Sequence, residues 1–275
     1  MALTVGTNMS ALNAISRLNN TQSSLSRSLG RIAAGTRIVS AADDAAGLGV
    51  AENLDAQSRS LKMAQRNTND GISVVQTADG AASEIGNILK RMRELAVQSS
   101  SETLEDQERS YVNDEFAALG SEIDRIAAVT EFNGVSLATA AASLDVQVGT
   151  DGTANSRISI ALADLQSTTL NVDTGSADLA SAANAQDALT DIDAALDTVN
   201  SVRSGFGAAQ NRLESAYRQL DNYYLNLTEA ESRVRDTDYA MESAEMSKLQ
   251  IMQQAGVAVL AQAKNMNASA AQLLV

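Results

Sequence analysis

Between Gly71 and Gln98 the sequence carries an apolar repeat that constrains the fold more than any other feature. Its positions alternate between three and four residues apart over three heptads, and this seam consists of Val75, Ala78, Ala82, Ile85, Leu89, Met92 and Ala96. Such spacing predicts an α-helix with one apolar stripe of the coiled-coil kind. A helix from Asp43 to Gln98 would be roughly 84 Å long at about 1.5 Å per residue. Because it cannot cover its own stripe, it needs partner helices from elsewhere in the chain.

The composition favours long helices packed in a thin layer over a thick globular core. The 275 residues include no His, Cys, Trp or Pro, and aromatic residues make up only 3%. Aromatic side chains normally supply much of the buried area of a thick core. The lack of Cys excludes disulfides and thiolate sites. Because His, Cys and a nucleotide-binding glycine pattern are all absent, the sequence predicts no enzyme active site, no cofactor and no metal site.

Charge is distributed unevenly along the chain, whose net charge is −14. Residues 1–42 contain four Arg and no acid, residues 139–200 contain nine Asp and one Arg, and residues 249–275 contain one charged side chain, Lys264. We expect the acidic middle to face water and the sparsely charged ends to be buried against other molecules. Nucleic acid is not an expected partner for so acidic a chain. No secretory signal and no membrane-spanning apolar run is found, so no membrane partner is expected.

The first part of the chain is predicted to form two helices. Residues 5–33 carry one thin apolar stripe, and Gly35 is suited to end that helix. Ser40 and Asp43 resemble a capping box that opens the long helix. That helix is expected to end in the three serines at 99–101.

A third helix is predicted to follow. Thr103 and Asp106 again resemble a capping box, and the apolar spacing of three and four residues continues to Thr130. This helix is expected to pack antiparallel on the long helix. The sequence Phe132-Asn133-Gly134 should end it, because Asn-Gly favours turns.

In the middle of the chain the apolar period changes to two. Residues 144–148 and 158–162 alternate apolar and polar side chains on either side of a loop that contains Gly149 and Gly152. This pattern predicts a β-hairpin with a long loop. Leu170 and Val172 are predicted to add another short strand.

Heptads return from about Ala182 and continue to Val234, and a last helix follows Asp238. The apolar positions of the last helix are spread around several faces, so it needs neighbours on more than one side. The expected fold is mainly α: a long antiparallel coiled-coil-like helical rod formed by both chain halves, with a small β-hairpin element at the midpoint. The predicted segments are the terminal helices 1–42 and 236–275, the rod helices 43–138 and 185–235, and the hairpin segment 139–184.

Several motifs in both halves of the chain resemble those of bacterial flagellins. They lie at residues 31–35, 40–48, 66–73, 91–98, 132–134, 236–240, 246–248, 251–256 and 259–263. The similar regions cover residues 1–138 and 185–275. The tail departs from the family, because Asn267 lies where a Pro is common and the chain ends in Leu273-Leu274-Val275. The middle is also short, with room for the hairpin but not for large outer domains.

The resemblance implies a subunit that is secreted through the flagellar type III export apparatus with an export chaperone. It would polymerise with other copies of itself beneath the filament cap, giving the extracellular flagellar filament used for swimming. The implied filament core contains Leu25, Leu29, Ile32, Met246, Leu249, Ile251, Val259 and Leu260. The alternative is a hook–filament junction protein, which shares the terminal helices.

The resemblance also implies a recognition surface. Arg91 and Leu95, with Glu115 on the next helix, resemble the surface that the vertebrate flagellin-sensing Toll-like receptor reads. The alternative is a solvated helix face on which Arg91 and Glu94 pair at a spacing of three residues.

The acidic middle of the chain, which we expect to be a solvated surface, has two alternative interpretations: a cation site and a glycosylated surface. A cation site is not favoured, because Asp145, Asp151 and Asp164 lack EF-hand spacing. O-glycosylation is the other alternative, and its candidate residues are Ser167, Thr168 and Thr169.

Overall fold

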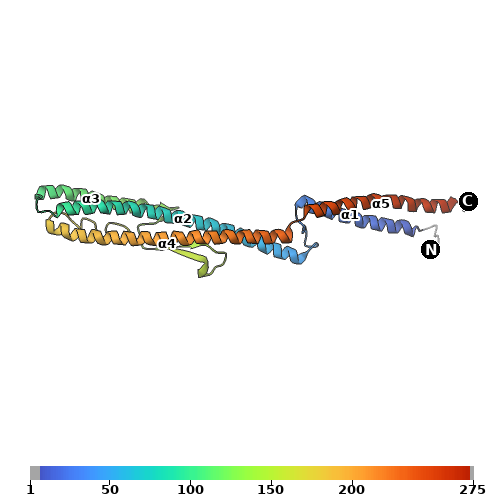
Figure 1. Ribbon diagram of the computed structural model, residues 1–275, viewed down its shortest axis with the longest axis horizontal. Helices are drawn as coiled ribbons and strands as arrows, with labels where there is room; N and C mark the ends of the chain where they lie inside the picture. The colour runs from blue at the N-terminus through green and yellow to red at the C-terminus, as the bar shows by residue number, and fades with distance from the viewer. Residues whose placement is uncertain (1–6, 273–275) are drawn as a thin grey trace. The chain divides into compact units, whose positions relative to one another are not determined.

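The computed structural model describes residues 7–272, with side chains described for residues 7–265. The chain forms two compact units, one of residues 1–57 and 226–275 (unit 1) and one of residues 58–225 (unit 2). Both are built mainly from long helices, and the described part of unit 2 also holds two antiparallel strand pairs (Figure 1). The predicted mainly α fold of long antiparallel helices with a small hairpin is therefore confirmed. The terminal Leu273-Leu274-Val275 lies outside the described residues.

Three helices form the framework of unit 2: α2 (Ala45–Ser99), α3 (Asp106–Val129) and α4 (Ala182–Arg235), of which α2 and α4 extend beyond the unit. Two ion pairs show that α2 and α4 run antiparallel. Arg93 Nε lies 2.7 Å from Asp193 Oδ1. Arg203 Nε lies 2.9 Å from Asp79 Oδ1. Arg203 interrupts the apolar spacing of α4, and this ion pair gives its charge a partner across the helix interface.

The core of unit 2 is the interface among these three helices and the hairpin. All seven seam residues of α2 are buried. The same cluster contains aromatic and branched side chains from the facing helices: Phe116 and Ile123 from α3, and Ile192, Val199, Phe206 and Leu213 from α4. Burial of this apolar area is the main source of stability for the unit.

Both predicted helix starts in this region are wrong by a few residues. Ser40 donates to the Asp43 carboxylate from its backbone N (3.0 Å) and its hydroxyl (3.1 Å), which makes a separate turn. The helix begins after Asp44, whose Oδ1 accepts a hydrogen bond from the backbone N of Gly47 at 2.8 Å. For α3, the capping box is formed by Glu105 and Glu108 instead of Thr103 and Asp106.

The link between α2 and α3 is organised around a buried arginine. The side chain of Arg109 is 6% exposed. Its guanidinium donates to the backbone carbonyl oxygens of Ser99, Ser101 (2.9 Å) and Leu104 (3.1 Å). Since the last carbonyls of a helix lack partners within the helix, Arg109 satisfies the end of α2 and holds the turn closed.

Two short strand pairs follow α3. β1 (Glu131–Phe132) pairs with β2 (Val135–Ser136) across a turn in which Asn133 and Gly134 have φ of 51° and 78°. Both values lie in the left-handed region that Asn and Gly tolerate best. The turn signal is therefore confirmed.

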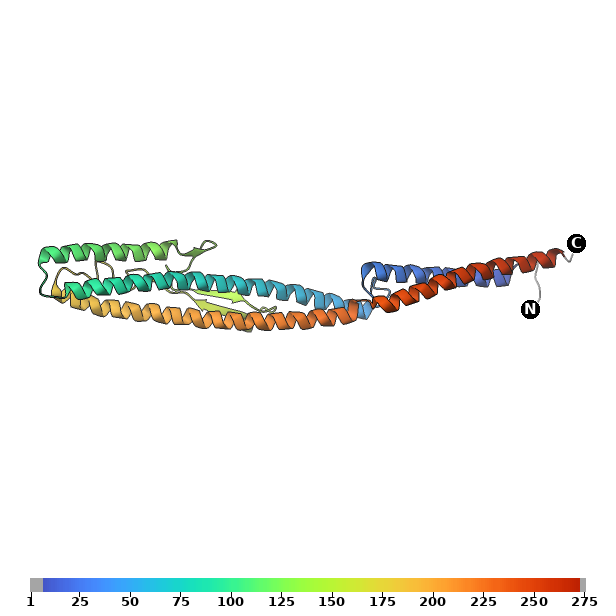
Figure 2. The same ribbon diagram turned by 45° about the horizontal axis from the view of Figure 1, so that its top comes forward.

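The predicted hairpin is also confirmed, as β3 (Ser143–Gln147) and β4 (Arg157–Ala161), with a short helix η1 (Ala154–Ser156) in its loop. Leu144 pairs with Ile160, and Val146 pairs with Ile158. Figure 2 shows the hairpin alongside α2 and α4.

The short strand predicted at Leu170 and Val172 is wrong, since this segment forms turns. Asn171, between the two, has φ of 54°, which an extended strand does not allow. Both apolar side chains are nevertheless buried in the core cluster. The alternating pattern thus reflects two inward side chains on a turn.

Unit 1 is built around α1 (Met9–Ala34) and α5 (Tyr239–Gln272), which lie side by side (Figure 1). Gly35 ends α1 with φ of 70°, as predicted for a left-handed helix terminus. Within the described residues, none of the helices contains a stretch long and apolar enough to cross a membrane.

Candidate assembly and recognition surfaces

The terminal helices α1 and α5 pair antiparallel. The side-chain amide of Asn8, which also caps α1, donates to the carbonyl oxygen of Ala263 at 2.8 Å. Farther along, Leu18 lies against Gly256, where an added β-carbon would be 3.2 Å from Leu18 Cδ1. Residues near the two ends of the chain therefore meet, and the missing side chain of Gly256 allows the helices to approach closely.

The inward faces of this pair follow coiled-coil spacing but are only partly apolar. On α1 the buried and half-buried positions include Ala11, Ala14, Leu18, Thr21, Leu25, Ser28 and Ile32. On α5 they include Glu242, Met246, Leu249, Gln253, Gly256, Leu260 and Ala263. Small and polar residues occupy about half of these positions. This is why the apolar residues alone showed no clear stripe on α5.

The outward faces of the same two helices expose many large apolar side chains. Ile251 is 66% exposed and Val259 is 58% exposed. The exposed set also contains Met9, Leu12, Ile15 and Leu29 on α1 and Tyr239, Met241, Met252 and Val257 on α5. Exposed apolar patches are typical of interaction sites.

The residues predicted for a filament core divide between the two faces. Leu25 and Leu249 are buried in the pair, Ile32, Met246 and Leu260 are half-buried, and Leu29, Ile251 and Val259 are exposed. Sequence reasoning missed Met9, Leu12 and Met241, which lie at positions that its apolar stripes did not include. Only the exposed members are available to a neighbouring molecule.

A short bridge in unit 1 joins the end of α1 to the link between α4 and α5. Thr36 and Asp236 form an antiparallel β-bridge. The backbone N of Arg37 donates to Arg235 O at 2.7 Å, and the N of Thr237 donates to Gly35 O at 3.1 Å. This backbone pairing joins residues 35–37, which follow α1, to residues 235–237, which precede α5.

Arg31 lies beside this bridge, between two carboxylates. Its guanidinium is 3.7 Å from Asp43 Oδ1 and 3.9 Å from Glu242 Oε2. Hydrogen bonds from Ser40 lower the pKa of Asp43, and the charge of Arg31 lowers it further. The motif residues Arg31 and Asp43 are thus brought together in unit 1.

In unit 2 the structure brings Arg91 and Glu115 into contact. Arg91 Nη2 and Nε donate to Glu115 Oε1 at 2.8 and 3.0 Å, and Nη1 donates to Glu94 Oε2 at 3.0 Å. These hydrogen bonds raise the pKa of Arg91. All three side chains are exposed, so the cluster forms a charged surface that links α2 to α3.

Leu95 does not belong to that surface. Its side chain is 2% exposed and lies in the core cluster. The expectation that Leu95 lies on an exposed face of the helix is therefore wrong. The reason is that α2 is covered by α3 as well as by α4, so it buries two faces instead of one.

Ser167 is likewise not available at the surface. It is 2% exposed, and its backbone N and hydroxyl donate to the Asp124 carboxylate at 2.7 and 2.8 Å. Thr169 and Thr168 are exposed, and Thr169 donates to Asp164 Oδ2 at 2.8 Å. In residues 7–265, no group of three or more His, Cys, Asp or Glu side chains is arranged to hold a metal ion.

Family models match both helical halves of the chain. The bacterial flagellin N-terminal helical region matches residues 5–142, and the bacterial flagellin C-terminal helical region matches residues 189–274. A flagellin of Halalkalibacterium halodurans is 41% identical over 268 residues, which cover 97% of this chain and 98% of that protein. A flagellin of Bacillus subtilis is 36% identical over 300 residues, with 97% and 98% covered.

Solved structures show the same fold. The crystal structure of Bacillus cereus flagellin has a TM-score of 0.50 and 33% identity, covering 56% of this chain and 88% of that one. A structure assigned to a flagellar hook-associated protein of Vibrio parahaemolyticus has a TM-score of 0.60 but only 15% identity, covering 70% and 100%. The latter likeness concerns the fold alone.

The exposed apolar helices of unit 1, the seam of unit 2 and the matches to both helical regions agree with one another. The chain therefore belongs to the bacterial flagellins, a family of structural proteins that assemble as subunits of the flagellar filament.

Proposed function

We propose that this chain polymerises into the shaft of a flagellar filament that drives swimming motility. The observation that carries the proposal is the row of exposed apolar side chains on α1 and α5, with Met241 and Ile251 as its most exposed members on the second half of the chain. The α1–α5 pair covers only its inward faces. Neighbouring copies would bury the outward faces and gain about 25 cal/mol per Å² of apolar area.

In this proposal each predicted segment has a role. Residues 1–42 and 236–275 build the filament core, residues 43–138 and 185–235 form the stiff rod around it, and residues 139–184 add the hairpin to the rod. The filament cap would retain arriving subunits at the growing tip.

Secretion is part of the same proposal, with the flagellar export apparatus and an export chaperone as partners. An exported chain must cross the apparatus unfolded and refold outside. The sequence is compatible with this route, since it has no Pro to impose slow isomerisation and no Cys to cross-link in transit.

The second candidate is a hook–filament junction protein, favoured by the fold likeness to the hook-associated protein. Identity favours the filament subunit, at 41% to a flagellin against 15% to that structure. The two functions differ in the number of layers that each protein adds to a filament end.

Seeded growth distinguishes them. Purified monomer is added to sheared filament fragments, and filament length is followed by electron microscopy. A filament subunit extends the fragments in proportion to monomer supplied, whereas a junction protein adds a terminal layer and stops. Ile251→Lys should abolish extension, while Gln250→Lys, at the neighbouring exposed polar position, should leave it intact. Extension by both variants would contradict the role of the apolar face.

Arg91 and Glu115 are proposed as contacts for the vertebrate Toll-like receptor that senses flagellin. Support comes from their exposure and their fixed geometry across α2 and α3. Binding of monomer to the receptor ectodomain should fall in Arg91→Ala and in Glu115→Ala. Arg125→Ala is the control, because Arg125 is also an exposed arginine paired with a glutamate. Equal affinity of all three variants would refute the assignment.

A further inference from the structure

The turn between β1 and β2 carries the only Asn-Gly pair of the chain, Asn133-Gly134. Both residues are exposed. Apart from the chain neighbours of Gly134, no atom lies within 4 Å of the position that a β-carbon on this glycine would take. Because glycine has no side chain to shield its own backbone nitrogen, the turn places a side-chain carboxamide next to an open backbone amide in solvent.

Neither of these two groups has a partner that holds it in place. Within residues 7–265, the Asn133 carboxamide makes no hydrogen bond, and the backbone N of Gly134 donates to no acceptor. The strands on either side pair only through Phe132 with Val135 and through Glu131 with Ser136. Since a strand pair this short adds little stability of its own, the turn should open locally at a small cost in free energy.

We propose that Asn133 is a site of spontaneous deamidation. The backbone N of Gly134 loses its proton to solvent base and attacks Asn133 Cγ. The new bond closes a succinimide ring, and the bond from Cγ to the side-chain nitrogen breaks, so that nitrogen leaves as ammonia. Water then adds to one of the two ring carbonyls and reopens the ring. The sum is one water consumed and one ammonia released, with no change in oxidation state and no cofactor.

The ring can open in two ways, which differ in their effect on the turn. Opening at Cγ gives an ordinary aspartate, which keeps the main chain and tolerates the left-handed φ of 51° at this position. Opening at the main-chain carbonyl gives isoaspartate, in which the main chain runs through Cγ and is one carbon longer. Turn length sets the register of a hairpin, so the isoaspartyl chain cannot keep Phe132 opposite Val135. Either product adds a negative charge beside the exposed Glu131.

The isoaspartyl product should also disturb the residues next to the strand pair. Leu137 and Ala138 are each 2% exposed, and the N of Leu137 donates to Thr130 O at 3.0 Å. Thr130 is the C-terminal cap of α3. The turn thus joins the end of α3 to buried side chains of unit 2. Loss of its register should loosen this corner and leave the seam of α2 in place. The inference goes beyond the proposed function and does not depend on it.

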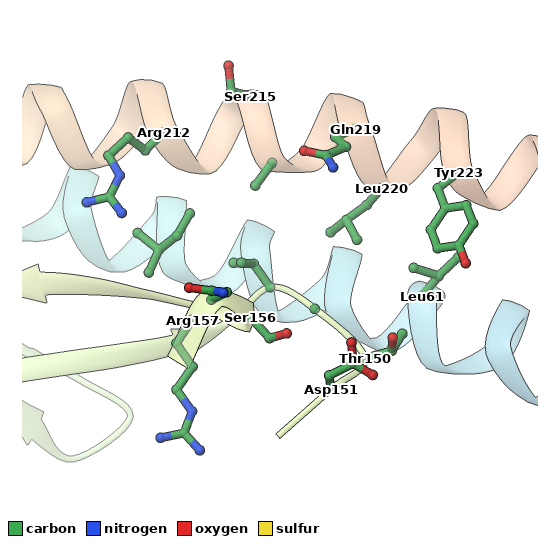
Figure 3. Close-up of a pocket in the computed structure, with 15 residues that line it drawn as sticks. Leu61, Thr150, Asp151, Ser156, Arg157, Arg212, Ser215, Gln219, Leu220 and Tyr223 are labelled. Atoms are coloured by element: carbon green, nitrogen blue, oxygen red, sulfur yellow. The ribbon is translucent and has the colours of Figure 1, made fainter. Parts of the chain in front are cut away.

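Comparable sites elsewhere in the chain are shielded. Asn155 is exposed in the hairpin loop, but the N of Ser156, which would have to attack it, donates to Thr153 O at 3.1 Å. Ser156 also lines the groove of about 480 Å³ between this loop and α4 (Figure 3). The pair Asp70-Gly71 could form the same ring by losing water, but it lies within α2, where backbone nitrogens are held in helical hydrogen bonds.

Peptide mapping of aged protein tests the site. Purified full-length monomer is kept in mildly alkaline buffer, and peptides from digestion at acid pH are followed by mass spectrometry. Deamidation raises the mass of the peptide by about 1 Da, and electron-transfer fragments distinguish isoaspartate from aspartate. Asn133 should convert at least about tenfold faster than Asn155 in the same molecules, since glycine leaves the attacking nitrogen open. Isoaspartate should appear at position 133.

Two further samples separate the chemistry from the surroundings. Asn133→Asp is the matched control, because it keeps the turn and has no side-chain ammonia to lose, so its peptide should gain no mass. A synthetic peptide of residues 127–140 gives the rate without the fold. Because exposed turns open at little cost in free energy, the folded chain should convert within about tenfold of the peptide. Circular dichroism melting before ageing shows that both proteins are folded.

Each contrary result overturns the proposal. Conversion at Asn133 no faster than at Asn155 would refute the site. Conversion in the folded chain that is slower than the peptide by more than about tenfold would show that the turn protects the carboxamide. A mass gain without isoaspartate would mean direct hydrolysis in place of the succinimide. Because only monomer is used, these results stand apart from seeded extension, which tests the proposed function.

Discussion

Gly71 of α2 faces Val146 of β3 so closely that an added β-carbon would lie 2.9 Å from Val146 Cγ2 and 3.1 Å from Cγ1. The hairpin thus rests on the long helix at a point where the helix has no side chain. A glycine within a helix costs about 1 kcal/mol relative to alanine. Glycine offsets that cost here because it leaves room for Val146 of the hairpin to pack against the backbone of α2.

Gly71→Ala should destabilise the protein by about 1–2 kcal/mol net, because overpacking outweighs the gain in helix propensity. Rotation of Val146 gives no relief, since both of its methyl groups are close. Gly80→Ala is the control, with nothing within 4 Å of its added β-carbon, and should stabilise by about 0.5–1 kcal/mol. Urea denaturation measures both, and a gain for Gly71→Ala would contradict the close packing.

Leu89→Ala should lower the free energy of unfolding by about 2–5 kcal/mol, because Leu89 is fully buried in the middle of the seam. Val97→Ala, on the same helix but half exposed, should change it by less than about 1 kcal/mol. Thermal melting of the monomers compares the two. Equal melting temperatures for both variants would show that the seam does not hold the unit together.

Arg109→Met should cost at least about 2 kcal/mol, since it leaves the carbonyl groups of Ser99, Ser101 and Leu104 without their donor. Arg125→Met removes an exposed arginine from the same helix and serves as control. Hydrogen exchange should show faster opening at residues 99–106 in the Arg109 variant only. Unchanged exchange there would mean that the turn closes without the buried guanidinium.

Acidification should weaken the contact between α2 and α4 through Asp193. Hydrogen bonding by Arg93 lowers the pKa of this carboxyl below its usual 3.8 in the folded chain. The pair therefore stabilises the fold above pH 3.8, and this contribution is lost as pH falls through the lowered pKa. Asp193→Asn should melt below the natural chain at neutral pH, and the difference should vanish once the pH is below the lowered pKa of Asp193. A difference that persists at acid pH would point to a steric cause.

Much of the fold could be predicted because the apolar residues of the long rod helices repeat at spacings of three and four residues. The seam from Val75 to Ala96 required a partner helix, and the alternation around Leu144 and Ile158 required paired strands. Helix starts were less predictable, since Ser40, Asp43 and Asp44 are all capable of capping and only the tertiary contacts select among them.

The surfaces were predicted less well than the core. Leu95 lies outside the single apolar seam of α2, and one seam is enough for contact with one partner helix, so the sequence placed Leu95 on the exposed side. In unit 2 both α3 and α4 pack on α2, and the second contact buries Leu95. On α5 the inward positions Glu242, Gln253 and Gly256 are polar or small, so the apolar pattern followed the outward face as well. Which side a neighbour covers cannot be inferred from one chain's periodicity.

Deletion of residues 249–275 separates folding from assembly. The deletion removes Leu249 from the inward face of the α1–α5 pair and Ile251, Met252, Val257 and Val259 from its outward face. It leaves every residue of unit 2, including the seam and the facing positions of α4, in place. Melting of unit 2 should therefore remain within a few degrees of the natural chain, since none of its buried contacts is lost.

Assembly of the same variant should fail, because the deletion removes Ile251, Met252, Val257 and Val259, which supply most of the exposed apolar side chains of α5. At about 25 cal/mol per Å², loss of a few hundred Å² per subunit would weaken each addition by several kcal/mol. We therefore expect no extension of seeds at any practical monomer concentration, while the full chain extends them under the same conditions. Gln250→Ala serves as the control for a change on α5 that removes little apolar area. If the truncated chain still forms long filaments, contacts of unit 2 alone hold the subunits together, and the exposed face of the terminal helices has another purpose.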